Sequence, residues 1–194
     1  MSAPIDFSNR NPLNGLDSLF HQRWSPRAFS SKPVSHNDLA MVFEAARWSP
    51  SAFNEQPWRF ITCTAQTHEK FLNLLVDANK AWAQQAPVIG FITGERRFSQ
   101  TDADNSVFEF DTGSAWMAMT LQARMLGLYT HGMAGVHYGK VYNALGIDVA
   151  TTKVICGFAL GYIGDPDNLP EAARKMEQPS ARKPLKEIWR SVDI

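Results

Sequence analysis

Apolar residues recur at helical spacing in several stretches of the chain. Within residues 37–47 they line one face of a helix, and Ser35 has the hydroxyl side chain that caps such a helix at its start. Shorter helices are expected at residues 14–22 and 140–145. A further helix begins after the cap residue Thr67 and runs to about residue 76. The pattern thus predicts four short helices.

The longest helical pattern covers about residues 106–126. From Ala115 onward it is apolar on nearly every side, and Gly127 follows as the residue that ends it. A helix of this kind needs cover all round, which a small domain can hardly provide. The pattern therefore predicts a central, buried helix whose burial a second subunit would complete.

Three apolar runs predict strands, at residues 58–63, 88–93 and 154–160. The first follows a loop rich in helix breakers at residues 49–57. The acidic segment 95–111 is expected to be a solvated excursion that leads into the long helix, and the last 30 residues an extended arm. Because helices and strands mix without regular alternation, the fold class expected is α+β.

Length and charge limit the function classes that are possible. The 194 residues, 44% of them hydrophobic, predict a single domain that spans residues 1–194 and has a real core. The 19 basic and 19 acidic side chains give a net charge of zero. A protein that coats nucleic acid or an anionic membrane carries a basic excess, so neither partner is expected.

The remaining composition gives no sign of metal or disulfide chemistry. Cys63 and Cys156 are too few for a disulfide framework and are expected to be free thiols in a reducing compartment. The five histidines lack the spacing of metal ligands, so no metal is expected. No basic-then-apolar signal sequence opens the chain, which predicts a cytoplasmic protein.

Two basic clusters could recognise a phosphate. Arg23, Ser25 and Arg27 place two guanidinium forks and a hydroxyl within five residues, and Arg182 lies in a second basic segment near the end of the chain. Taken singly, each cluster also agrees with a solvated turn or charge run. Both readings stay open at this point.

Two further segments could recognise a flat ring. Ser51, Asn54 and Gln56 place small hydrogen-bonding side chains on the loop before the first strand, although an ordered turn would use the same residues. The glycines of the expected turn at 131–135 would let backbone N–H groups approach a ligand closely. Phosphate and ring together indicate a mononucleotide cofactor but no reaction.

Taken in order, these segments resemble the nitroreductase family of FMN-dependent oxidoreductases. The most specific piece is Ser-Pro-Ser-Ala-Phe-Asn-Glu-Gln-Pro-Trp at residues 49–58, which is similar to the family's APSSxNxQPW loop. The Arg-x-Ser-x-Arg element at 23–27 precedes it. The central helix at 111–128, the last strand at 161–164 and the basic arm at 182–185 follow it.

The resemblance implies a fold and an assembly. The fold is α+β with a mixed central sheet flanked by helices, built as an intertwined homodimer. A C-terminal arm, about residues 165–194, would wrap around the partner subunit. Two FMN sites would lie at the interface, which would also explain the long helix that is apolar all round.

The resemblance also implies the residues that bind FMN, and it implies no catalytic side chain. One group would hold the phosphate, the ribityl chain and the ring edge. A second would reach the flavin of the other subunit from the loop at 49–58, and a third would face the ring and its N5 side. The three groups are Arg23, Ser25, Arg27 and Arg182; Pro50, Ser51, Ala52, Asn54 and Gln56; and Asn79, Met133, Ala134 and Gly135.

Three residues depart from the family pattern. Trp24 replaces a basic or histidine residue, and Ala52 replaces a second serine in the loop. Ser180 stands where many members have a basic residue two positions before Arg182. This last departure predicts one cation fewer at the phosphate.

The reaction implied is a ping-pong transfer of hydride from NADH or NADPH, through FMN, to a small electron-poor acceptor. Nitroaromatics, quinones and activated alkenes are the acceptor classes. Two alternatives remain. The same cofactor could serve a specialised reaction such as dehalogenation, flavin destruction or enone reduction, or the protein could be a non-catalytic flavin sensor or storage module.

Overall fold

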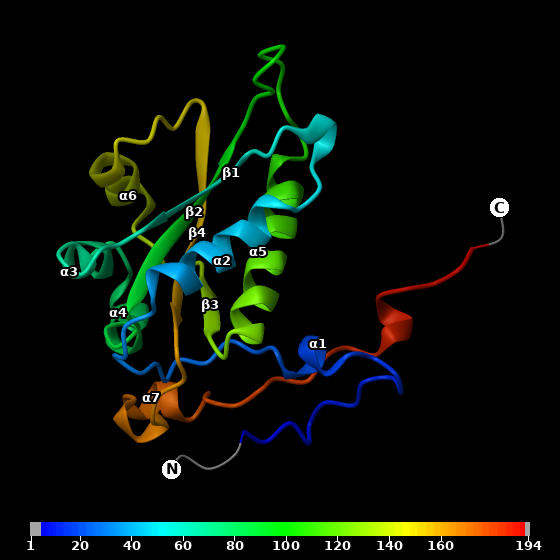
Figure 1. Cartoon of the computed structure of the whole chain (residues 1–194), viewed down its shortest axis with the longest axis vertical. Coiled ribbons are helices and arrows are strands. Elements are labelled where there is room, and N and C mark those ends of the chain that lie inside the picture. Colours follow the sequence, from blue (N-terminus) through cyan, green and yellow to red (C-terminus); the bar gives the residue numbers. More distant parts are fainter. Residues whose placement is uncertain (1–4, 193–194) are drawn as a thin grey trace.

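The computed structural model describes residues 5–192, and a four-stranded sheet forms its centre. The strands β1 (Trp58–Thr62), β2 (Val88–Glu95), β4 (Thr152–Gly161) and β3 (Tyr129–Met133) lie side by side in that order (Figure 1). The inner strand β2 is buried along almost its whole length. The three strand runs read from the sequence are confirmed, and each inner strand extends beyond its expected bounds.

Every neighbouring pair of strands in this sheet runs antiparallel. Strands β2 and β3 point in the same direction, but β4 lies between them and runs opposite to both. Within residues 5–192, parallel strands are therefore never neighbours, and the sheet is antiparallel where a mixed sheet was expected. The α+β fold class itself is confirmed.

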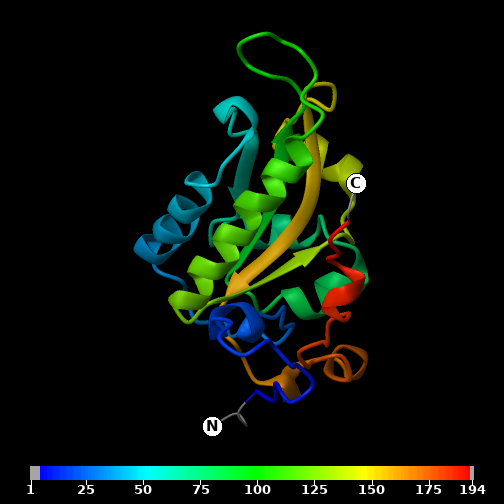
Figure 2. The ribbon, with the colours of Figure 1, turned by 90° about the vertical axis from the view of Figure 1, so that its right-hand side faces the viewer.

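Helices cover both faces of the sheet. The helices α2 (His36–Arg47) and α5 (Phe108–Met125) pack together on one face, and α3 (His68–Leu72), α4 (Asp77–Ala83) and α6 (Tyr138–Leu145) lie on the other (Figures 1 and 2). Each face has its own apolar core. Among the described residues, no helix is both long enough and apolar enough to cross a bilayer.

Helix α5 is covered on one side only. Ala115, Met119 and Ala123 are fully buried against the sheet and α2. On the outer side, the Phe110 side chain is 79% exposed and Met117 is also exposed. The inner side is thus buried as predicted, and the outer apolar side is the part whose cover was expected from a second subunit.

Local signals place the start of α2 correctly but not the end of α3. The Ser35 hydroxyl accepts a hydrogen bond from the Asp38 backbone N–H at 3.0 Å, as an N-cap does. The helix expected to run to about residue 76 ends at Leu72. The chain turns there because the Val76 N–H binds the Gly135 carbonyl at 3.2 Å, and a separate helix, α4, follows.

The glycine-bearing turn expected at residues 131–135 is only partly a turn. Residues as far as Met133 belong to β3, because His131 pairs with Ala159 of β4 and Met133 pairs with Gly157. The C-terminal arm is likewise interrupted, by the short helix α7 (Glu171–Arg174) and by 3-10 turns such as η3 (Leu185–Glu187). At the other end of the chain, α1 is shorter than expected (Ser18–Gln22).

The segment that follows α1 is held against the end of β4. Phe29 forms a β-bridge with Ile163, and the Gly164 N–H donates to the Ala28 carbonyl at 2.8 Å. The backbones approach so closely that a Cβ on Gly164 would lie 2.4 Å from the Phe29 carbonyl oxygen. This contact fixes residues 23–30 relative to the sheet.

We expect Gly164→Ala to destabilise the protein by about 2–4 kcal/mol, because rigid backbone atoms occupy the space of the new methyl group. Gly139→Ala is the matched control, since a Cβ there meets no atom within 4 Å. It should change the free energy of unfolding by about 0.5 kcal/mol or less. Urea unfolding monitored by circular dichroism measures both, and equal stability of the two variants would contradict the proposed contact.

Candidate functional site

Four guanidinium groups surround a cavity of about 270 Å³ beside the end of α1. They come from three separate parts of the chain: the N-terminal segment, the segment after α1 and the C-terminal arm. The arginines are Arg10, Arg23, Arg27 and Arg182, and the cavity is completed by Trp24, Ser25, His131, Met176, Gln178 and Ser180. Four of the residues expected to bind the cofactor thus lie together.

The charges in this arginine cavity are not balanced by the protein. Within residues 5–192, none of its four arginines forms an ion pair with a carboxylate. Burial lowers the pKa of the Arg23 guanidinium, and the positive charges of Arg182 and Arg10 lower it further. Like charges held this close attract an anion, and guanidinium forks match the oxygens of a phosphate.

The nearby carboxylate of Glu177 forms no ion pair with these arginines. Its oxygens accept hydrogen bonds from the backbone N–H groups of Arg27, at 2.8 and 3.0 Å, and of Ala28, at 2.9 Å. The Arg27 guanidinium instead donates to the Met176 carbonyl at 3.2 Å. Glu177 therefore ties the arm to the segment after α1, and the cavity stays positive.

His131 reaches the arginine cavity from β3. Its Nδ1 lies 2.9 Å from the Pro26 carbonyl oxygen, and its ring lies against Trp82 with centroids 4.5 Å apart. Burial is the main reason that the pKa of His131 is lowered to about 4, and the neighbouring Arg27 and Arg23 lower it as well. The imidazole is therefore neutral at pH 7, and Nδ1 carries the proton because a carbonyl can only accept.

The free energy of unfolding should fall as the pH is lowered from about 6.5 to about 4. In that range the unfolded chain protonates His131, whose pKa is then ordinary, while the folded protein with a pKa of about 4 does not. The full loss amounts to about 3 kcal/mol. Urea titrations at pH 7 and pH 5 should show about 2 kcal/mol of it.

His131→Asn removes this titration and should show a weaker pH dependence than the wild type. The matched control is His36→Asn, because His36 is exposed at the start of α2 and should leave the dependence unchanged. If His131→Asn and the wild type lose the same stability between the two pH values, His131 is not the group responsible.

A second group of expected residues surrounds the turn after β3. The Asn79 side chain, on α4, donates to the Gly135 carbonyl at 3.0 Å. A Cβ on Gly135 would lie 2.5 Å from Asn79 Nδ2, so a larger residue there would displace the Asn79 side chain. The N–H groups of Ala134 and Gly135 donate to no group among the described residues. They are therefore available to a ligand.

Strand β3 connects this turn to the arginine cavity. His131 lines the cavity, and Ala134 follows three residues later. Extended backbone spans about 10 Å over three residues. The cavity and the free N–H groups of the turn are therefore close enough for one elongated molecule to contact both.

The loop expected to contact a ring is ordered by its own side chains. The Ser51 hydroxyl accepts from the Gln56 N–H at 2.9 Å, and the Gln56 amide donates to Asn54. Asn54 and Gln56 both adopt left-handed backbone conformations. The Ala52 N–H donates to the Asp111 carboxylate of α5 at 3.0 Å. These bonds give the loop one defined shape.

This loop lies far from the arginine cavity. It contains η1 (Ala52–Asn54), which is at one end of the long axis of the molecule, whereas α1 and the segment after it are at the other (Figures 1 and 2). Within one chain the structure does not bring Pro50, Ser51, Ala52, Asn54 and Gln56 to the remaining candidate residues.

Sequence reasoning missed Arg10 and a side-chain position for His131. Arg10 stands 13 residues before Arg23, in a stretch with no helical or strand pattern, and no local signal marks it. The sequence pattern places His131 in a turn and indicates no role for its side chain. Both enter the cavity through long-range contacts with the segment after α1.

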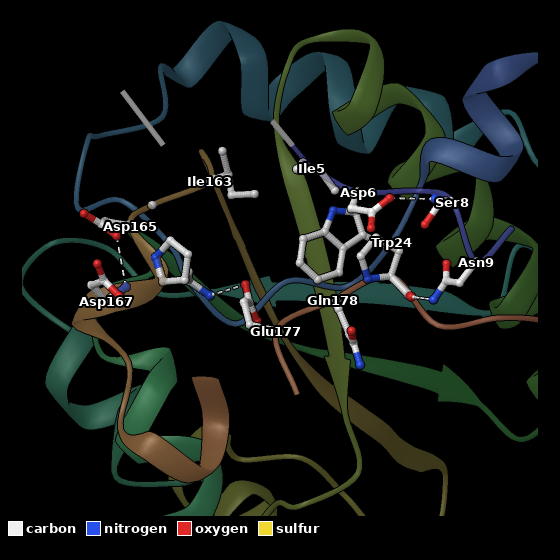
Figure 3. Close-up of a pocket in the computed structure, with 14 residues that line it drawn as sticks. Ile5, Asp6, Ser8, Asn9, Trp24, Ile163, Asp165, Asp167, Glu177 and Gln178 are labelled. Atoms are coloured by element: carbon white, nitrogen blue, oxygen red, sulfur yellow. Dashed lines mark hydrogen bonds between the residues drawn. The ribbon is translucent and has the colours of Figure 1, made fainter. Parts of the chain in front are cut away.

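A larger cavity of about 940 Å³ adjoins the arginine cavity and shares Trp24 and Gln178 with it (Figure 3). Four carboxylates line its wall; Asp167 lies 3.8 Å from Arg174 Nη1, and the other three accept backbone N–H groups. Asp6 accepts from Ser8, Asp165 from Asp167, and Glu177 from Arg27 and Ala28. Among the described residues, no group of three or more acidic, histidine or cysteine side chains is placed to hold a metal ion.

Comparison with known proteins agrees with this arrangement. The sequence model of the nitroreductase family matches residues 21–86 and 70–162. An oxidoreductase containing FMN is 34% identical, with 97% of this chain and 96% of that chain covered and a TM-score of 0.88. A protein from Desulfovibrio desulfuricans, assigned as a nitroreductase and solved with FMN, is 23% identical, with 94% and 99% covered and a TM-score of 0.72.

Other solved structures share the fold at lower identity. The enone reductase CLA-ER is 20% identical, with 77% of this chain and 89% of that chain covered and a TM-score of 0.65. The two ranges matched by the family model include Arg23, the loop at 49–58 and the turn after β3. Sequence and fold agree, and the chain belongs to the nitroreductase family.

Proposed function

We propose that this protein is an FMN-dependent oxidoreductase that takes electrons from NADH or NADPH and passes them to small electron-poor acceptors. The observation that carries the proposal is the arginine cavity, which has four guanidinium groups and no carboxylate paired with them among the described residues. Bound FMN would supply the hydride chemistry at N5 of its ring. The family match and an FMN-containing relative with 34% identity support this choice of cofactor.

The residues of this chain have three roles in the proposal. Arg23, Arg27 and Arg182, with the Ser25 hydroxyl, would hold the phosphate and the ribityl chain. The free N–H groups of the turn at 133–135 would face the N5 side of the ring. Asn79 already donates to the Gly135 carbonyl, so its main role would be to hold that turn in position. None of these roles requires a side chain that exchanges protons.

A homodimer would complete the site. The outer side of α5 exposes Phe110 and Met117, and Phe20 of α1 and Leu16 just before it are also exposed, so an apolar surface remains uncovered beside the cavity. The end of the C-terminal arm projects away from the body of the molecule (Figure 1) and exposes further apolar side chains, including Trp189. A second copy would cover these surfaces, and its loop at 50–56 would reach the cavity that the first copy's own loop does not.

The first test is the cofactor itself. Purified protein should bind FMN, and both NADH and NADPH should be tried as reductants of the bound flavin under anaerobic conditions. Arg23→Ala should weaken FMN binding by about tenfold to a hundredfold, because it removes charge-assisted hydrogen bonds. Arg97→Ala, in the exposed loop after β2, is the control and should bind as the wild type does.

Two results would change the conclusion. Protein that neither contains nor takes up FMN would rule out the proposal. Flavin that binds but is bleached by neither nicotinamide would favour a sensor or storage module. For an active enzyme, a panel with one nitroaromatic, one quinone and one enone compares the acceptor classes directly.

The second test asks whether two subunits share each site. Arg23→Ala and a Ser51→Ala, Asn54→Ala double variant should each lower the rate of acceptor reduction. Refolded together, they should recover about a quarter of wild-type activity, because half of the dimers are mixed and each mixed dimer has one intact site. If the activity of the mixture equals the mean of the two variants, both groups act within one subunit.

A further inference from the structure

Arg10 enters the arginine cavity from the N-terminal segment, which contains none of the family's sequence motifs. Its Nε donates to the Ser180 carbonyl at 3.0 Å, and its Nη1 donates to the carbonyls of His21, at 2.6 Å, and Arg23, at 2.8 Å. Among the described residues, its Nη2 donates to nothing. Two N–H donors of a half-buried cation in the cavity wall therefore remain available.

The electrostatic surroundings of Arg10 point to an anion as the missing partner. Burial lowers the pKa of the Arg10 guanidinium, and the positive charge of Arg182 lowers it as well. Arg10 in turn lowers the pKa of Arg23. An arginine needed only to bind carbonyls would be more stable away from other cations. Its placement against two of them is favourable once an anion lies between them.

Arg10 also lies where the sequence leaves a gap. Ser180 stands where many family members have a basic residue, and Trp24 is an apolar, buried side chain beside Arg23. The Arg10 guanidinium bonds the backbone of position 180 directly and that of Arg23 next to Trp24. It thereby adds a second positive charge beside the Ser180 carbonyl, to which Arg182 also donates at 3.1 Å.

We propose that Arg10 is the fourth cation of the phosphate site, donating through Nη2 to the terminal phosphate of the cofactor. Its Nε and Nη1 hold the C-terminal arm and the segment after α1 on either side of that phosphate. The inference rests on the proposed function, because it takes the phosphate to be that of FMN. It assigns a binding residue that lies outside every motif read from the sequence.

The chain provides a control for the competing explanation, in which Arg10 only ties the arm in place. Its neighbour Asn9 donates through Nδ2 to the Pro179 carbonyl at 2.5 Å, so it makes the same kind of tie without a charge (Figure 3). Asn9→Ala therefore loosens the arm and leaves the cation. Arg10→Gln removes the cation, and Arg10→Lys keeps a charge but loses the fork.

The experiment titrates flavin-free protein with FMN and with riboflavin, which lacks the phosphate, and follows flavin fluorescence. Arg10→Gln should weaken FMN binding about tenfold to a hundredfold more than it weakens riboflavin binding, because riboflavin affinity falls only as far as the arm is loosened. Arg10→Lys should retain part of the preference for FMN. Asn9→Ala should keep the full ratio of FMN to riboflavin affinity, even if both affinities fall. The affinity of Arg10→Gln for FMN should also depend less on salt.

Equal losses of FMN and riboflavin affinity in Arg10→Gln would overturn the inference, as would no loss of either. Arg23→Ala separates this failure from failure of the proposed function. If Arg23→Ala loses the preference for FMN and Arg10→Gln keeps it, the phosphate site is right and only the role of Arg10 is wrong. Wild-type protein that binds FMN no better than riboflavin would refute the phosphate site itself. Thermal unfolding of each variant checks that it folds.

Discussion

The constraint on which the site depends is the repulsion among four guanidinium groups held around one small cavity. The protein reduces this repulsion without neutralising it, because backbone carbonyls accept from Arg10 and Arg27 while Glu177 is engaged by backbone N–H groups. Carbonyl dipoles stabilise each cation but leave the net charge in place. An anionic ligand is therefore favoured by the electrostatics of the folded chain, and its binding should in turn stabilise the contacts between arm and body.

The sheet supplies the rigidity that this arrangement needs. The segment after α1 is held at the end of β4 by the Phe29–Ile163 bridge. Strand β3 places His131 in the cavity, and the free N–H groups of the turn follow a few residues later. The two parts of the candidate site thus sit on paired neighbouring strands. The hydrogen bond from Asn79 of α4 to the Gly135 carbonyl fixes the position of this turn.

The position of the loop before β1 is the main reason to propose a site shared by two chains. Its hydrogen bonds, including the one to Asp111 of α5, hold the loop at the end of the molecule opposite the arginine cavity. The same helix exposes an apolar side that a single chain leaves uncovered. A second copy of the chain would account for both the exposed side of α5 and the distant loop. It would cover α5 and bring its own loop toward the first copy's cavity.

Local interactions explain what the sequence alone determined. Several features depend only on residues a few positions apart, and each could be predicted from those residues. They are the Ser35 cap, the left-handed Gly127 after α5, the apolar strand runs and the Arg-x-Ser-x-Arg segment. Other features depend on partners distant in the chain. They are the early end of α3, the strand character of residues 131–133, the antiparallel order of the strands and the position of Arg10 in the arginine cavity. Only the tertiary structure decided these, because their energies come from long-range pairing that no local pattern encodes.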